Sequence, residues 1–311
     1  MASNNNTVYI IAGPTAVGKS TIAFYLAKRL GGEIVNCDSI QLYKYMDIGS
    51  AKPAAKEMNA LPHHLYSIAE PEYNLTAAEY QKLALQTIDE ILSRGKTPIV
   101  TGGTGLYLHS ILYEMDFAAV PEDDGARRRE LEAMAEKLGA TYMYEYLSAI
   151  DPDAAERIHP NNTRKVVRAI EAFETGTNVR DLDNCRPNTK YDFRFFGLNM
   201  ERERLYERIN KRVITLIKMG LIDEVKALKA RGLNKDTPSM KAIGYKEVLA
   251  YLDGEMPLKE TIYEIMKNTR RYAKRQLTWL KRYDGMIRWI DIEQGRTVGS
   301  VIDEILSAEQ E

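Results

Sequence analysis

The sequence predicts an α/β fold, a P-loop NTPase-like parallel sheet flanked by helices, with an inserted helical subdomain. Three observations lead to this prediction. The phosphate-binding pattern G-x-x-x-x-G-K-[ST] occupies residues 13–20, between an apolar run and a helical pattern. Short apolar runs alternate with helical patterns along residues 7–103, which is typical of parallel sheets. Residues 121–186 contain helical patterns without strand-like runs, which indicates an insertion.

The first strand, loop and helix surround the phosphate-binding pattern. "TVYIIAG" (7–13) is a short β-rich run, and the helical spacing of Ile22 and Leu26 follows it. In this context the loop N–H groups, the helix N-terminus and the Lys19 ammonium are expected to bind phosphate, and the Ser20 hydroxyl to ligate Mg²⁺. The residues of this predicted phosphate loop are Gly13, Pro14, Thr15, Ala16, Val17, Gly18, Lys19 and Ser20.

Two further strands are predicted to end beside this loop. "EIVNCDS" (33–39) places Asp38 at its end, and "TPIVTGG" (97–103) ends in a glycine turn. Because ligands of parallel sheets lie beyond the carboxyl ends of the strands, the phosphate loop, Asp38 and residues 101–105 are expected to converge. Asp38 is then a magnesium ligand, a proton acceptor, or simply the cap of a following helix.

The helices and the later strands complete the predicted core. Thr76 and Glu79 form a capping box that opens a helix between the second and third strands. Further on, "YDFRFFGLNM" (191–200) and "MIRWIDI" (286–292) are expected strands on either side of a helix-rich segment.

Within that segment, residues 204–228 are expected to form mostly one packed amphipathic helix, on which Arg208 and Arg212 share a face. We accordingly divide the chain into a core of residues 1–120 and 187–311 and an inserted helical subdomain of residues 121–186.

Composition narrows the class of protein. The 311 residues are 44% hydrophobic and carry a net charge of −1, so any nucleic-acid partner requires a local basic patch. Cys37 and Cys185 are the two cysteines and have no metal-ligand spacing, which argues against structural zinc and a disulfide framework. The start, "MASNNNT", lacks the apolar segment of a signal peptide, and no run has the length of a membrane span. We expect a cytoplasmic monomer without a membrane or protein partner.

A local basic patch is present in "KNTRRYAKRQLTWLKR" (267–282). This run has seven basic residues and no acidic one, with Tyr272 and Trp279 among them. Clustered Lys and Arg bind phosphate backbones, and aromatic side chains stack on unpaired bases. The alternative interpretation is an ordinary solvated helix face.

The strand that ends at residues 101–105 lacks an acidic residue. ATP-using enzymes of this fold supply a second carboxylate to hold the metal, so its absence weakens assignment as an ATPase or a kinase without excluding one.

At this point the chain resembles the tRNA dimethylallyltransferase family, in its bacterial form, whose members prenylate adenosine next to the anticodon. The resemblance covers about nine-tenths of the chain. It rests on blocks that occur in the family's order: "GPTAVGKST" (13–21), "DSIQLYKYMDIGSAKP" (38–53), "PHHL" (62–65), "TGGTGLY" (101–107), "RIHPNNTRKVVRAIE" (157–171), "SMKAIGYKE" (239–247) and "AKRQLTWLKR" (273–282).

The resemblance implies that the phosphate loop binds the diphosphate of dimethylallyl diphosphate, with Mg²⁺ as cofactor. It implies catalytic roles for Thr15 and Arg212 at the diphosphate and for Asp38 as general base. It also implies contacts with the tRNA anticodon stem-loop. With two arginines of the basic run added, the predicted tRNA contacts are Asp38, Ser39, Ile40, Gln41, Thr104, Arg127, Arg164, Lys165, Arg168, Lys241, Gly244, Tyr245, Lys246, Arg271 and Arg275.

Three other functions stay open at this point. An adenylate isopentenyltransferase uses a similar loop and donor on a free nucleotide, but needs neither the basic run nor the insertion. A small-molecule kinase is disfavoured by the missing second acid. An RNA-binding protein without enzymatic activity would retain the phosphate for structure alone.

Overall fold

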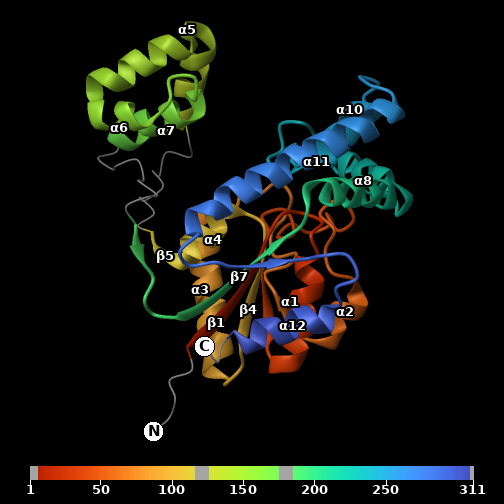
Figure 1. Ribbon diagram of the computed structural model, residues 1–311. Helices are drawn as coiled ribbons and strands as arrows, with labels where there is room; N and C mark the ends of the chain where they lie inside the picture. The colour runs from red at the N-terminus through yellow and green to blue at the C-terminus, as the bar shows by residue number, and fades with distance from the viewer. Residues whose placement is uncertain (1–5, 116–125, 175–184, 309–311) are drawn as a thin grey trace. The chain divides into compact units, whose positions relative to one another are not determined.

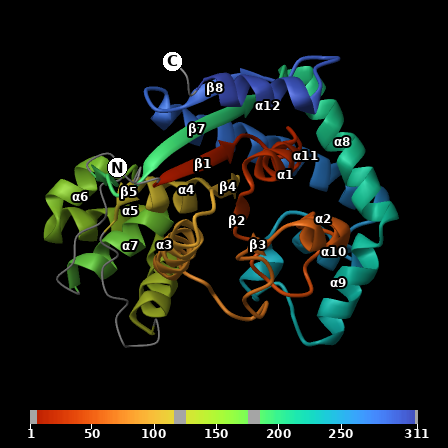
Figure 2. The same ribbon diagram turned by 90° about the horizontal axis from the view of Figure 1, so that it is seen from below.

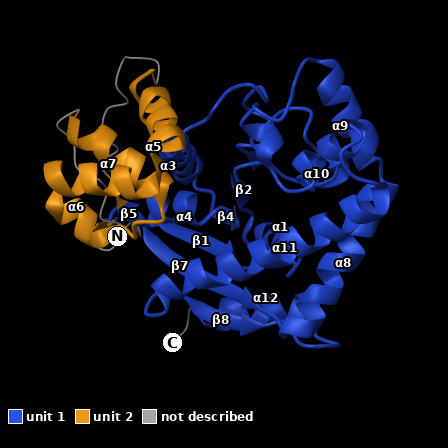
Figure 3. Ribbon diagram, turned by 90° about the horizontal axis from the view of Figure 1, so that it is seen from above, with its two compact units in different colours: residues 1–113, 188–311 blue, residues 114–187 orange. Residues whose placement is uncertain are grey.

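The computed structural model describes residues 6–115, 126–174 and 185–308. The chain forms two compact units, which Figure 3 shows in different colours. The first contains residues 1–113 and 188–311, and the second contains residues 114–187. Among the described residues, no helix combines the length and the apolar character that crossing a bilayer requires.

A six-stranded parallel sheet forms the centre of the first unit, which confirms the predicted α/β class (Figure 1). Strand β1 lies between β4 and β7, so that Tyr9 pairs with Ile99 on one side and Arg194 on the other. Figure 2 shows β7 beside β1, with β8 at that edge of the sheet. The strand order is β3 (His63–His64), β2 (Glu33–Cys37), β4 (Pro98–Gly102), β1 (Thr7–Ala12), β7 (Asp192–Asn199) and β8 (Arg288–Asp291).

The continuous apolar run of β1 is explained by burial on both faces of the sheet. Val8 and Ile10 join a core with α3 (Ala77–Ser93) and α4 (Gly105–Leu112). Tyr9 and Ile11 point to the opposite face and pack with α1 (Lys19–Leu30) and α12 (Val298–Ser307). The predicted capping box opens α3, because the Thr76 hydroxyl accepts from Glu79 N and the Glu79 carboxylate accepts from Thr76 N.

A third hydrophobic cluster joins the helices of the C-terminal half to residues that follow β2. Val213, Leu221 and Val248 pack there with Tyr43 and Met46. The helices of this cluster are α8 (Arg202–Lys218), α9 (Leu221–Ala230), η1 (Ser239–Lys241), α10 (Tyr245–Leu252) and α11 (Leu258–Leu280). Two short helices outside it are α2 (Ala55–Ala60) and η2 (Lys281–Tyr283).

The second unit has its own core. Leu131, Met143 and Leu147 pack with Val166 and Ile170 among its three helices. Those helices are α5 (Ala126–Ile150), which is interrupted at Gly139, α6 (Pro152–Arg157) and α7 (Thr163–Glu174).

Three local expectations were wrong. Residues 204–228 are two helices rather than one, because Gly220 has a left-handed backbone (φ 104°) that ends one helix and caps the next. Strand β3 was not predicted either. It consists of two histidines and is too short to show the alternation of apolar and polar residues by which a strand is recognised. Arg186, expected within an all-helical segment, begins the two-residue strand β6 (Arg186–Pro187), which pairs with β5 (Tyr113–Glu114).

Candidate active site

A cavity of about 210 Å³ opens where the carboxyl ends of β1, β2 and β4 meet. The phosphate loop, Asp38 and part of the 101–105 turn line it, so the predicted convergence is confirmed. The lining residues are Thr15, Ala16, Gly18, Lys19, Ser20, Thr21, Asp38, Gln41, Ser50, Tyr66, Thr101, Gly102, Arg208, Arg212 and Gln276.

The phosphate loop is built around a lysine that bonds back to its own loop. Gly18 precedes α1, and the Lys19 ammonium donates to the Pro14 carbonyl oxygen at 2.9 Å. The Val17 side chain is buried in the core, so this loop residue presents only its backbone towards a ligand. This arrangement places a cation and a helix N-terminus at one wall of the cavity.

Three cations line the cavity and one carboxylate accompanies them. Arg208 and Arg212 lie one turn apart on α8 and both line the cavity. Arg208 also contacts the phosphate loop, because its Nε donates to the Ala16 carbonyl oxygen at 3.0 Å. Burial lowers the pKa of Arg212, and the nearby Asp38 carboxylate partly opposes this shift. The lining charges therefore favour a multiply charged anion.

Asp38 is held in a defined position by the backbone around it. Its Oδ1 accepts a hydrogen bond from Ile40 N at 3.0 Å, and Asn36 contacts its backbone N–H and carbonyl groups. Thr104, the residue that precedes α4, accepts from Ser39 N through its hydroxyl oxygen at 3.0 Å. Asp38 and Thr104, both predicted tRNA contacts, thus belong to one connected wall.

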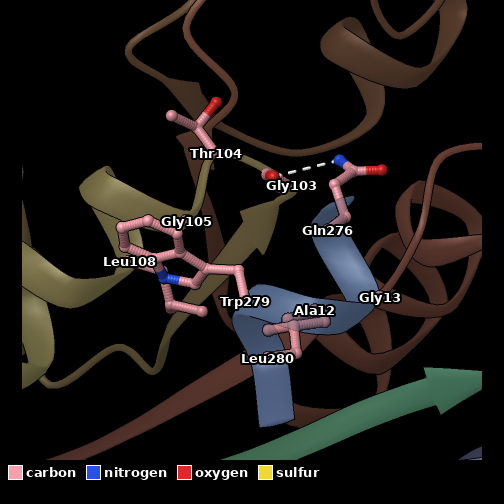
Figure 4. Close-up of a pocket in the computed structure, with 10 residues that line it drawn as sticks. Ala12, Gly13, Gly103, Thr104, Gly105, Leu108, Gln276, Trp279 and Leu280 are labelled. Atoms are coloured by element: carbon pink, nitrogen blue, oxygen red, sulfur yellow. Dashed lines mark hydrogen bonds between the residues drawn. The ribbon is translucent and has the colours of Figure 1, made fainter. Parts of the chain in front are cut away.

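A glycine turn lets α11 approach the ends of the strands (Figure 4). Gln276 accepts from Thr15 N at 2.8 Å and donates to the Gly103 carbonyl oxygen at 3.0 Å, so one amide joins the turns that follow β1 and β4. A Cβ on Gly103 would lie 2.1 Å from Gln276 Nε2, and one on Gly105 would lie 2.4 Å from the Trp279 ring. A larger residue at position 103 would therefore displace the Gln276 amide, and one at position 105 would collide with the Trp279 ring.

Sequence reasoning did not single out Gln276. A signal was available, because Gln276 is an uncharged polar residue on the buried stripe of α11 that includes Ala273 and Leu280. Buried polar side chains have hydrogen-bond partners, so its position predicted a specific contact without identifying it.

The other predicted tRNA contacts of the first unit differ in exposure. Lys241, Lys246, Arg271 and Arg275 are exposed, and the Arg275 guanidinium lies 5.6 Å from the Tyr272 ring centre. Gly244 and Tyr245 are buried, together with the Gln41 side chain. Ile40, in the turn that follows β2, is partly buried.

In the second unit, Arg164, Lys165 and Arg168 are exposed on α7. Arg127 makes a bidentate ion pair with Glu174, with both contacts at 2.7 Å. It also makes an ion pair with Glu130 through one hydrogen bond of 2.9 Å.

Desolvation makes Lys19 sensitive to pH. Enclosure in the cavity is the main cause that lowers its pKa to about 8, the Asp38 charge raises it, and Arg212 lowers it further. The ammonium that binds an anion is therefore present below about pH 8 and lost above it. We expect the affinity for inorganic diphosphate, measured by calorimetry, to fall as pH rises through 8. The Lys19→Arg variant, which keeps its charge, should lack this decline. An equal decline in the wild type and in Lys19→Arg would show that deprotonation of Lys19 is not its cause.

The site suits Mg²⁺ if a bound diphosphate supplies part of the ligand set. Among residues 6–115, 126–174 and 185–308, no group of three or more His, Cys, Asp or Glu side chains forms a metal cage. Ser20 and Asp38 both line the cavity and offer hard oxygen ligands. Mg²⁺ is commonly held by one or two such groups, substrate phosphates and water, so the donor set fits this ion.

Comparison with known proteins adds independent findings. A family model described as IPP transferase matches residues 41–283. The tRNA dimethylallyltransferase of Caldanaerobacter subterraneus is 45% identical over 305 residues, which cover 96% of either chain. The crystal structure of the full-length tRNA isopentenylpyrophosphate transferase from Bacillus halodurans is 40% identical, with a TM-score of 0.69, and the match covers 99% of this chain and 100% of that one. A eukaryotic dimethylallyltransferase acting on tRNA is 28% identical, with a TM-score of 0.79, over 98% of this chain and 77% of that one.

Proposed function

This chain belongs to the IPP transferase family, and we infer that it is an enzyme that transfers a dimethylallyl group to tRNA. We propose that the donor is dimethylallyl diphosphate and the acceptor N6 of the adenosine next to the anticodon. The observation that carries this proposal is the cavity in which Lys19, Arg208 and Arg212 accompany Asp38, which among the described residues is the one carboxylate that lines it. Cations suit the diphosphate, and the carboxylate suits an attacking amine.

The proposed reaction is a substitution at C1 of the dimethylallyl group. The N6 amine of adenosine forms a bond to C1 as the bond from C1 to the diphosphate oxygen breaks. This amine is a weak nucleophile because its lone pair is delocalised into the purine. Asp38, held at the cavity wall by Ile40 N, orients the amine and accepts its proton as the carbon–nitrogen bond forms.

The departing diphosphate carries the negative charge that develops in the reaction. Lys19, Thr15 and Arg212 line the cavity where we place it, and the loop N–H groups add donors. Preorganised charges of this kind stabilise a leaving group strongly, because they need no reorganisation during the reaction. Mg²⁺, held by Ser20 with the diphosphate oxygens, would neutralise part of the same charge when bound.

The acceptor base enters from the side of the cavity that Asp38 and Gln41 line. Both N–H groups of the Gln41 amide are used, by the carbonyl oxygens of Ser50 at 3.0 Å and Ala51 at 3.2 Å. The atom that Gln41 offers to a base is therefore its acceptor oxygen Oε1, which suits an exocyclic amine. An adenosine in a single-stranded loop leaves its stack at modest cost.

The exposed basic residues of α11 are proposed to hold the RNA backbone. Replacing Arg271 and Arg275 with Gln should weaken tRNA binding and reduce the slope of log affinity against log salt concentration by about one for each lost phosphate contact. Filter binding over a salt series measures both quantities. Lys28 and Arg29, exposed in the last turn of α1, provide a control pair with the same charge change. If the salt-dependence slope of the Arg271 and Arg275 variant is unchanged, residues 267–282 form an ordinary solvated helix face that does not contact the RNA.

One turnover assay tests the function against its alternatives. Labelled dimethylallyl diphosphate is incubated with unmodified tRNA or with AMP, and in a parallel reaction ATP labelled at its γ-phosphate is incubated with candidate small-molecule acceptors. Transfer to tRNA alone is the expected result. Transfer to AMP indicates an adenylate isopentenyltransferase, phosphoryl transfer from ATP indicates a kinase, and RNA binding without any turnover leaves a non-enzymatic protein.

A further inference from the structure

An internal carboxylate anchors the loop that follows Asp38 in the sequence. Glu224 on α9 accepts hydrogen bonds from the backbone N–H groups of three consecutive residues: Asp47 at 2.9 Å, Ile48 at 2.7 Å and Gly49 at 2.9 Å. The Tyr245 hydroxyl donates to the same carboxylate at 2.8 Å and accepts from Ser50 N at 3.1 Å. Four donors thus converge on one side chain that sequence analysis did not single out.

The anchored segment, which we call the 43–51 loop, has a backbone that needs external support. Tyr45 and Ala51 have φ angles of 63° and 51°, in the left-handed region that residues with a Cβ disfavour. Such conformations persist where the surroundings enforce them, and they concentrate at functional sites. Gly49 packs closely against α10, because a Cβ at this position would lie 2.6 Å from the Tyr245 ring.

The 43–51 loop leads directly to the acceptor side of the cavity. Ser50 lines the cavity, and the carbonyl oxygens of Ser50 and Ala51 orient the Gln41 amide, which also lines it. A continuous series of hydrogen bonds therefore runs from Glu224, through the loop backbone, to Gln41. The phosphate loop is not part of this series.

We propose that Glu224 is a positioning residue for prenyl transfer, which sets the conformation of the 43–51 loop and thereby the orientation of Gln41 beside Asp38. This inference rests on the proposed function. It predicts that Glu224 affects the acceptor side of the reaction without affecting the diphosphate side. A merely structural role would alter both sides together.

The test variant is Glu224→Gln, which keeps the shape of the side chain but replaces one acceptor oxygen with an N–H₂ donor. In either amide orientation at least one loop N–H then faces a donor. We expect the single-turnover rate with tRNA to fall by roughly 10- to 100-fold, since a displacement of about 1 Å in a positioned group can cost 10²-fold. The affinity for dimethylallyl diphosphate should stay within about twofold of the wild type.

The control is Asp223→Asn, one residue away in the same first turn of α9, which removes the same charge from an exposed side chain. It should behave as the wild type. Tyr245→Phe, which removes a single hydroxyl, should lower the turnover rate less than Glu224→Gln, and the two changes together should be non-additive. This second variant keeps the test informative if Glu224→Gln folds poorly.

Hydrogen exchange provides a readout that does not depend on activity. The peptide containing residues 43–51 should exchange faster in Glu224→Gln than in Asp223→Asn. If wild-type protein fails to prenylate tRNA, the proposed function fails, while exchange still tests the anchor. Turnover of Glu224→Gln within twofold of wild type, unchanged exchange, or donor affinity that falls in parallel with turnover would overturn the assignment.

Discussion

Asparagine in place of Asp38 is expected to lower the single-turnover rate of prenyl transfer by about 10²- to 10⁴-fold, the usual contribution of a positioned base. Asparagine retains the Oδ1 acceptor for Ile40 N, so the turn around residue 38 is preserved while the proton acceptor is lost. Rapid-quench measurement with saturating donor and tRNA isolates the chemical step from binding.

The donor affinity of this variant distinguishes catalysis from damage to the site. Removing a negative charge from the cavity in which we place the diphosphate should leave the affinity for dimethylallyl diphosphate unchanged or increase it. Because the Asp38 charge raises the pKa of Lys19, that pKa should fall further in the variant, and the comparison belongs near pH 7 or below. Asp303→Asn, exposed on α12, is the matched control. A near-normal transfer rate would remove Asp38 as the base.

Lys19→Met is expected to lower both donor affinity and the transfer rate, by roughly 10²- to 10³-fold, because it removes a preorganised cation from the leaving group. Calorimetry with inorganic diphosphate and single-turnover kinetics measure the two effects. Lys28→Met, an exposed position on the same helix, removes an equal charge and should change neither.

Thermal unfolding of the Lys19→Met protein should show whether its lower donor affinity and transfer rate come from the missing cation or from misfolding. The pKa of Lys19 is lower in the folded protein than its ordinary value of 10.5, so between about pH 8 and 10.5 the unfolded chain binds more protons. This residue therefore contributes least to the stability of the folded state below pH 8, where its charge is desolvated. The Lys19→Met protein should have an unfolding temperature at pH 7 no lower than that of the wild type. A lower temperature together with weak binding would contradict the interpretation.

Local signals in the sequence were sufficient for much of the core. The apolar run at residues 7–13 became β1, Thr76 and Glu79 formed their capping box, and the strand ends brought Asp38 to the phosphate loop. Each of these depends on residues a few positions apart or on the general rule for parallel sheets. The break at Gly220 was missed because an isolated glycine in a helical pattern is often tolerated.

Contacts between distant parts of the chain were not accessible in the same way. Gln276 bonds to Thr15 across 261 positions, and Glu224 bonds to Gly49 across 175. Neither glutamine nor glutamate has a local pattern that names its partner, since α8 to α11 had to be placed against the sheet before the partners met. The burial of Gly244 and Tyr245 could not be predicted from the sequence either, since their block was selected for its resemblance to RNA-contacting segments.

The amino-acid sequence alone determined the fold class, the phosphate loop with Lys19, and the family to which the chain belongs. These depend on short-range patterns and on short sequence motifs that can be read directly along the chain. Tertiary structure decided which cations face Asp38, which amide links the two strand-end turns, and which carboxylate holds the 43–51 loop. The physical reason is that a hydrogen bond or an ion pair depends on distances of about 3 Å in space, whatever the separation of its partners along the chain.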